Sequence, residues 1–458
     1  MIQNLGRLMS RTAGRAMPDP FVLAVLLTVV TLVASVLFGS EVAGLDVGPR
    51  LHKVVVEGWF AGLFGGALKF AFQMVFVLVT GFAVAHSRPV RALIDEVASL
   101  PRDAAQASAV VAFVACAAGY IHWGLGAVAG AMLAREIGRS WAAMKRPLHY
   151  PVLGAAAYSG LLVWHGGLSG SAPLKAAETK GFLADLTGAV PVEDTLFSGM
   201  NIAIVLSLVA VSVGLYYFLT PKAPTPDVWF QGELVETEPA AKTPGEGARQ
   251  FGIVRFLDDS VFIPIVVGCL SGGYLLWSAW TQGLSSLNLD TVNLAFLALG
   301  MLLHGSPRRY VAAAAKGARA SVGIILQFPL YFGILGMLTA SGLVAQLSEA
   351  IVGVASETTL PVLTFLSAGL VNLFVPSGGG QWAVQGPVMM KAAASLGADP
   401  GKVIIALSHG DAWTNMLQPF WALPLLGIMG LRARDIVGYT TLLCLLTGPV
   451  VIFWLLVW

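Results

Sequence analysis

Long apolar runs alternate with short polar segments along most of the chain. A helix needs about 20 consecutive apolar residues to cross a bilayer. By this rule the sequence predicts about nine full crossings, at residues 20–40, 66–86, 150–168, 197–219, 259–282, 289–304, 322–343, 403–426 and 437–458. We therefore expect an all-α polytopic membrane protein.

Two further apolar stretches, residues 105–137 and 357–394, are too long for one crossing and have glycine-rich centres, which predicts re-entrant hairpins. The second centre contains a proline and three consecutive glycines, which a continuous helix disfavours. In a membrane such a break survives only where protein buries it or where it lines a watery cavity. The helix that resumes there aims its free N–H groups at the break, which suits a carboxylate. We predict substrate contacts from Ser377, Gly378, Gly379, Gly380 and Gln381.

Three other clusters of polar and small residues interrupt the apolar pattern. They are the tip of the first hairpin, residues 164–173 in one crossing, and residues 408–415 in another. Two interrupted crossings that face two hairpin tips would enclose one cavity, so we predict substrate binding by His122, Trp123, Gly124, Ser169, Ser171 and Asn415, and ion coupling by Asp411, Thr414, His409 and His165.

Simpler interpretations of these clusters stay open. The histidines could bond only to backbone groups, and the glycines could serve only close helix packing. Asp411 is the one carboxylate well inside a predicted crossing, where ionisable groups are costly and usually functional. It could instead cap a helix that resumes after Gly410.

The chain also divides into two similar halves. A polar stretch at residues 220–257 separates a first membrane repeat, 20–219, from a second, 258–458, and residues 1–19 precede both. Gly378 follows Gly124 by 254 residues (378 − 124), as Gln327 follows Gln73 (327 − 73). Positive charges fall on one side if residues 1–19 and 220–257 are cytoplasmic, and the two hairpins then enter from opposite sides. Inverted repeats with broken helices are typical of secondary transporters.

Composition narrows the function further. The chain is 56% hydrophobic and 11% charged, with a mean hydropathy of +0.77, which excludes a soluble domain. The net charge of +2 and the absence of a basic block argue against a nucleic-acid partner. Three isolated cysteines form neither a disulfide framework nor a metal motif, and we expect no cofactor. No Arg or Lys lies deep in a predicted crossing, which favours a monoanionic substrate over a dicarboxylate.

The glycine-rich run and its neighbours carry a family resemblance. Residues 375–387, Val-Pro-Ser-Gly-Gly-Gly-Gln-Trp-Ala-Val-Gln-Gly-Pro, resemble the signature of the short-chain fatty acid transporter family, supported by residues 121–126 and 409–421. The resemblance spans essentially the whole chain. It implies a bacterial inner-membrane carrier of butyrate- or acetoacetate-type monocarboxylates, expected to be a homodimer. It also implies membership of a wider ion-transporter superfamily whose members have two opposed hairpins, are usually dimers and move a transport domain past a scaffold like an elevator.

The coupling ion stays open, as do other functions. Sodium-coupled dicarboxylate carriers of the wider superfamily have Ser-Asn-Thr at both hairpin tips, and neither tip here does. Na⁺ and H⁺ are therefore both candidates. The alternatives are a carrier for another small anion such as a dicarboxylate, an anion channel, and an intramembrane serine protease in which Gly167-Leu168-Ser169-Gly170 supplies the nucleophile.

Overall fold

The apolar runs fold as helices, because a chain this apolar has to satisfy its backbone hydrogen bonds within each segment. The computed structural model describes residues 20–65, 67–177, 188–222, 224–232, 252–373, 378–418 and 420–458. These ranges contain helices and turns but no strand, so the predicted all-α fold is confirmed. Residues 1–19, most of the predicted linker and Ser377 lie outside the described residues.

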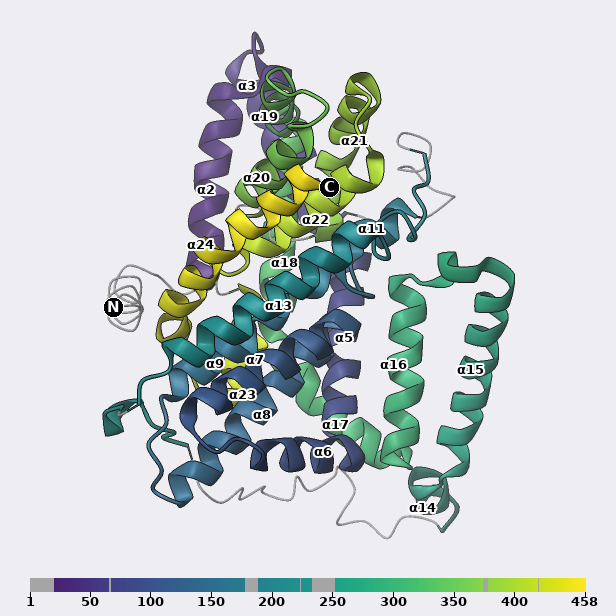
Figure 1. Cartoon of the computed structure of the whole chain (residues 1–458). Coiled ribbons are helices and arrows are strands. Elements are labelled where there is room, and N and C mark those ends of the chain that lie inside the picture. Colours follow the sequence, from purple (N-terminus) through teal and green to yellow (C-terminus); the bar gives the residue numbers. More distant parts are fainter. Residues whose placement is uncertain are drawn as a thin grey trace.

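The first half contains the helices up to residue 228 (Figure 1). They are α2 (Pro20–Phe38), η1 (Ser40–Val42), α3 (Val47–Leu51), η2 (His52–Phe60), α4 (Ala61–Phe64), α5 (Ala67–Ala85), α6 (Arg88–Ser99), α7 (Ala104–Ile121), α8 (Trp123–Ala143), α9 (Tyr150–Tyr158), α10 (Gly160–Val163), η3 (Trp164–Gly166), α11 (Ser171–Ala176), α13 (Gly199–Leu219) and η4 (Pro226–Val228).

The second half begins at residue 252, and its α15 and α16 stand together at one side of the molecule (Figure 1). Its helices are α14 (Gly252–Asp259), α15 (Phe262–Gln282), η5 (Gly283–Ser286), α16 (Leu289–His304), α17 (Pro307–Ala320), α18 (Val322–Ala340), α19 (Leu343–Val352), α20 (Leu360–Asn372), α21 (Gly378–Leu396), α22 (Pro400–Thr414), η6 (Phe420–Ala422), α23 (Leu423–Met429) and α24 (Ala433–Val457).

Helices recur along the two halves at a nearly constant spacing. α18 begins 255 residues after α5 (322 − 67), and α21 begins 255 residues after α8 (378 − 123). Packing recurs as well: α5 lies against α16 and α17 of the second half, while α18 lies against α2 and η2 of the first. The first helices of each half therefore pack against a long apolar helix of the other half.

Several helices are suited to a membrane. Within the described residues, α7, α13, α15 and α24 are long and apolar enough to cross a bilayer, and α5 with α6 adds a pair bent by 70°. α16 is shorter, at 16 residues, and the predicted crossings at 150–168 and 403–426 are each divided into shorter helices. The count of nine crossings stays a prediction, as does the membrane entry of the two hairpins.

Candidate functional site

The first interrupted crossing forms the centre of the site. After α9 and α10 a short 3₁₀ turn, η3, ends at Gly166, and regular helix returns only at Ser171. The non-helical segment is held by the first helix reversal, since the Leu168 N–H donates to the Tyr120 carbonyl over 2.8 Å. The predicted interruption therefore lies where the sequence placed it, in contact with the α7–α8 reversal.

The second interruption lies later than predicted. Residues from Ser408 to Thr414 are helical within α22, and the chain turns only from Asn415 onward. Gly410 is not a break: a Cβ there would collide with the Phe365 carbonyl oxygen, so this glycine allows α20 to pack closely on α22. Asp411 is consequently in the interior of α22, and the alternative that it caps a new helix is wrong.

A buried acid–imidazole pair joins the two interrupted crossings. His165 Nδ1 lies 2.8 Å from Asp411 Oδ2, and these side chains are 0% and 1% exposed. His165 Nε2 accepts the Ala172 N–H over 3.0 Å, so it carries no proton. The ring proton is then on Nδ1, which donates it to the Asp411 carboxylate. His165 is therefore the donor and Asp411 the acceptor of this hydrogen bond.

One oxygen of this carboxylate has no partner. Asp411 Oδ1 is buried and accepts no hydrogen bond from the described residues. A buried anionic oxygen without a donor is costly, and carboxylates in membrane segments usually have a functional partner. Asp411 Oδ1 is thus a buried acceptor that the described residues leave without a donor.

The second glycine-rich centre contacts the same pair. α21 begins at Gly378, where a Cβ would collide with the His165 ring and lie 2.6 Å from Ser171 Oγ. Gly379 and Gly380 follow in its first turn, so the positive end of the α21 dipole points toward the pair. Gln381 is turned elsewhere: its Nε2 donates to the Ala368 carbonyl over 2.9 Å and so fastens α21 to α20.

An amide network next to Asp411 was not predicted. Asn372 Nδ2 lies 2.8 Å from the Asp411 carbonyl oxygen, 2.9 Å from Thr414 Oγ1 and 3.0 Å from Asn415 Oδ1. Thr414 and Asn415, both predicted, therefore lie together at the end of α22. Asn372 ends α20 immediately before the second glycine-rich centre, and this lone amide in an apolar run is the signal that could have identified it.

His409 lies on another side of α22. Its Nε2 donates to Asn201 Oδ1 over 2.9 Å, and Asn201 Nδ2 donates to the Gly166 carbonyl. His409 therefore braces the first interruption against α13. In the described part of the chain it makes no hydrogen bond to Asp411, and Asn201 is a second functional candidate that the sequence did not predict.

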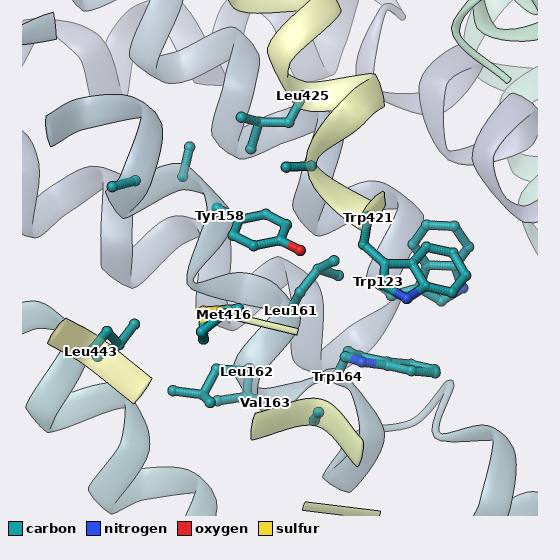
Figure 2. Close-up of a cluster of buried hydrophobic side chains, with 14 of the residues drawn as sticks. Trp123, Tyr158, Leu161, Leu162, Val163, Trp164, Met416, Trp421, Leu425 and Leu443 are labelled. Carbon is teal, nitrogen blue, oxygen red and sulfur yellow. The ribbon is translucent and has the colours of Figure 1, made fainter. Parts of the chain in front are cut away.

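The first hairpin tip packs through aromatic rings (Figure 2). Trp123 lies with its ring centroid 5.2 Å from that of Trp421 and 6.4 Å from that of Trp164. His122 caps α8 by accepting the Leu125 N–H at Nδ1, and Ser169 Oγ accepts the Trp123 N–H over 3.1 Å. Gly124 packs against Val77 of α5. This tip reaches the first interruption through Trp164, Leu168 and Ser169, and among the described residues it makes no hydrogen bond to the acid pair.

Comparison with known proteins identifies the family. The short chain fatty acid transporter model matches residues 1–458. The chain is 39% identical over 450 residues to an Escherichia coli (strain K12) protein and 37% identical over 464 residues to one from Haemophilus influenzae, each covering at least 98% of both sequences and each named "Putative short-chain fatty acid transporter". This chain belongs to the short-chain fatty acid transporter family.

Two solved structures are also similar. Neisseria gonorrhoeae MtrF aligns with a TM-score of 0.48 and 16% identity, over 98% of this chain and 96% of that protein. The Alcanivorax borkumensis YdaH transporter aligns with a TM-score of 0.47 and 15% identity, over 96% and 97%.

The family settles the broad class. This short-chain fatty acid transporter is a multi-pass membrane protein with a small-molecule substrate, and it is not an enzyme. Ser171 Oγ lies 3.2 Å from His165 Nε2, so Ser171, His165 and Asp411 resemble a hydrolase triad in outline. Because the Ala172 N–H already occupies Nε2, the lone pair that would take a serine proton is engaged.

Proposed function

We propose that this protein is a secondary active transporter of short-chain monocarboxylates of the butyrate and acetoacetate type, working by alternating access in the bacterial inner membrane. We further propose that Asp411 accepts the coupling cation. The observation that carries this proposal is the buried Asp411 Oδ1, which has no partner among the described residues and belongs to the carboxylate bonded to His165, whose ring lies against Gly378 at the start of α21.

Charge balance explains why a cation is needed. Like charges about 4 Å apart repel by about 4 kcal/mol at an effective dielectric constant near 20. In this proposal Asp411 is an anion, and a carboxylate that docks at the N-terminus of α21, next to His165, would approach it, whereas the hydrogen bonds of His165 leave its imidazole neutral. A proton or a sodium ion on Asp411 Oδ1 would remove this repulsion, so substrate and cation would bind together.

Both coupling ions have a place in this scheme. A proton would bind to Asp411 Oδ1 itself, since each nitrogen of His165 is already engaged. A sodium ion prefers several oxygen ligands, and the Asp411 carbonyl, Thr414 Oγ1 and Asn415 Oδ1 converge on the Asn372 amide nearby. Transport measured with a proton gradient alone and with a sodium gradient alone distinguishes these two.

We propose the inverted-repeat architecture on similar grounds. Two observations support two repeats of opposite orientation around the site. α18 follows α5 by 255 residues, and the first helices of each half pack against the other half. The cytoplasmic N-terminus, the two re-entrant hairpins, the elevator motion and the homodimer belong to the same proposal.

The decisive experiment is counterflow in proteoliposomes. Labelled acetoacetate outside and unlabelled acetoacetate inside, at pH 8, should give transient accumulation of label that excess butyrate suppresses. At that pH a monocarboxylic acid is ionised, which limits leakage of the neutral acid.

Lack of counterflow in folded protein would refute the proposal. Stronger suppression by succinate than by butyrate would indicate a dicarboxylate carrier. Ohmic currents would indicate a channel, and fluorophosphonate labelling lost in Ser169→Ala would revive the protease.

Asp411→Asn tests the coupling role. Asn Oδ1 still accepts the His165 proton, so the fold is expected to persist. A hydrogen bond to a charged group is worth about 1.5–3 kcal/mol, or roughly 10- to 100-fold in affinity. Gradient-driven uptake should fall by that factor, whereas counterflow, which needs no net ion movement, should fall less. Equal gradient-driven uptake by Asp411→Asn and the native protein would remove Asp411 from coupling.

A further inference from the structure

A cavity lined by basic side chains lies apart from the acid pair and includes neither of its residues. It has a volume of about 250 Å³ and lies where α5 and α16 end and where α6 and α17 begin. Its polar lining consists of His86, Arg88, Arg91, His304, Arg309 and Lys316. Neither the transport proposal nor the family description assigns a role to these residues.

The cavity is strongly positive. Among the described residues that line it, four carry a full positive charge and none is a carboxylate; Arg91 and Lys316 also have other interactions, so Arg88 and Arg309 contribute most to the field. The nearby Asp258 and Asp259 are paired with Arg308, at 3.4 and 3.5 Å, and this arginine is not in the lining. The helices α6 and α17, of 12 and 14 residues, both begin here and add the positive ends of their dipoles. An anion is the ligand that this field favours.

The two imidazoles give the cavity a fixed wall. His86 Nδ1 donates to the Phe82 carbonyl over 3.0 Å, and His304 Nε2 donates to the Ala83 carbonyl over 2.8 Å. Both rings are therefore fastened to the last turn of α5, one from its own chain segment and one from α16. Arg88 and Arg309 lie in the first turns of α6 and α17, next to these two fixed rings.

The surroundings favour a lipid as the source of the anion. α6 bends 70° away from α5, as an amphipathic helix at a membrane surface would (Figure 1). Leu303 lines the cavity, and Leu299 and Leu302 of the same helix, α16, are 43% and 45% exposed. A headgroup in the cavity would thus leave its acyl chains along an apolar helix face. Basic cavities between membrane helices are known to hold anionic headgroups.

We propose that this cavity binds the phosphate group of an anionic phospholipid, with Arg88 and Arg309 as the principal ligands. Arginine suits this role because its planar guanidinium donates two parallel hydrogen bonds to phosphate. The bound lipid would join the α5–α6 corner to the α16–α17 corner and so stabilise the contact between the two halves of the transporter.

The test is thermal unfolding of the purified full-length protein in detergent. Added phosphatidylglycerol should raise the unfolding midpoint by roughly 2–4 °C more than phosphatidylcholine. The double variant Arg88→Gln, Arg309→Gln should lose that difference, and both side chains are exposed enough for the variant to fold. The control, Lys145→Gln with Arg319→Gln, removes two exposed charges outside the cavity and should keep it.

The outcomes are distinct. Equal shifts with the two lipids, or a phosphatidylglycerol effect that persists in the Arg88 and Arg309 variant, would overturn the proposal. Inorganic phosphate that reproduces the phosphatidylglycerol shift would reassign the cavity to a soluble oxyanion. Phosphatidylglycerol retained after detergent exchange, measured by mass spectrometry, should likewise be lost only in the cavity variant.

Discussion

The two helix reversals at the centre of the transporter are built differently, although they occupy corresponding positions in the chain. The α7–α8 reversal is a single extended residue, His122, whose imidazole caps α8, and it is followed by a tryptophan packed among other aromatic rings. After the α20–α21 reversal the helix resumes at Gly378, whose backbone lies against His165 and Ser171. Packing fixes the first reversal, and close approach to the His165 ring defines the second.

This difference assigns unequal roles to the two halves. The first reversal has one side-chain hydrogen bond to the interrupted crossing, from the Trp123 N–H to Ser169. The second brings a helix N-terminus to the ring of His165, which is hydrogen-bonded to the buried Asp411 carboxylate. We therefore expect substrate and cation binding to depend mainly on the second reversal, and structural integrity mainly on the first.

The largest effect should come from leaving Asp411 without its partner. Leaving a buried acceptor without its hydrogen-bond donor costs about 1–3 kcal/mol, and more when the acceptor is charged. His165→Leu should therefore strongly lower the thermal unfolding midpoint in detergent. Adding Asp411→Asn to this variant removes the charge and should restore most of the loss. If the double variant is no more stable than His165→Leu alone, Asp411 is not an anion paired with His165.

A smaller effect is expected at the start of α21. Gly378→Ala places a methyl group against the His165 ring and Ser171 Oγ. Overpacking of this kind costs about 1–3 kcal/mol, and each 1.4 kcal/mol is tenfold in an equilibrium. Counterflow should slow by roughly tenfold or more.

The matched control for Gly378 is Gly214→Ala. Gly214 is within α13, and a Cβ there meets no atom within 4 Å, so transport should be unchanged or the protein slightly more stable. Unchanged counterflow in Gly378→Ala would mean that the N-terminus of α21 does not approach the site during transport.

The sequence predicted the helices well because apolar runs and glycine-rich breaks are local signals. The start of α8 and the start of α21 both follow directly from such breaks. The family also followed from one contiguous motif. Ser377, the centre of that motif, lies outside the described residues, so its proposed contact with substrate stays a prediction.

Partnerships between distant residues could not be read in the same way. His165 and Asp411 were both predicted coupling residues, but they are separated by 246 positions, and no local pattern pairs them. Gly410 was misread as a break because a packing glycine and a helix-breaking glycine look alike in one sequence. Asn372 and Asn201 were missed because a single amide in an apolar run carries little weight until its three-dimensional partners are known.

The smallest effect should come from the first reversal. Ser169→Ala leaves the buried Trp123 N–H without its acceptor, at a cost of about 1–3 kcal/mol in stability. The aromatic contacts with Trp164 and Trp421 remain and should hold the reversal in place. The unfolding midpoint should therefore fall, while the KM for acetoacetate should change by no more than about twofold. A tenfold change in KM would require a loss of about 1.4 kcal/mol in binding free energy. If KM rises in Ser169→Ala as far as it does in Gly378→Ala, both reversals contact the substrate, and the site is symmetric between the halves.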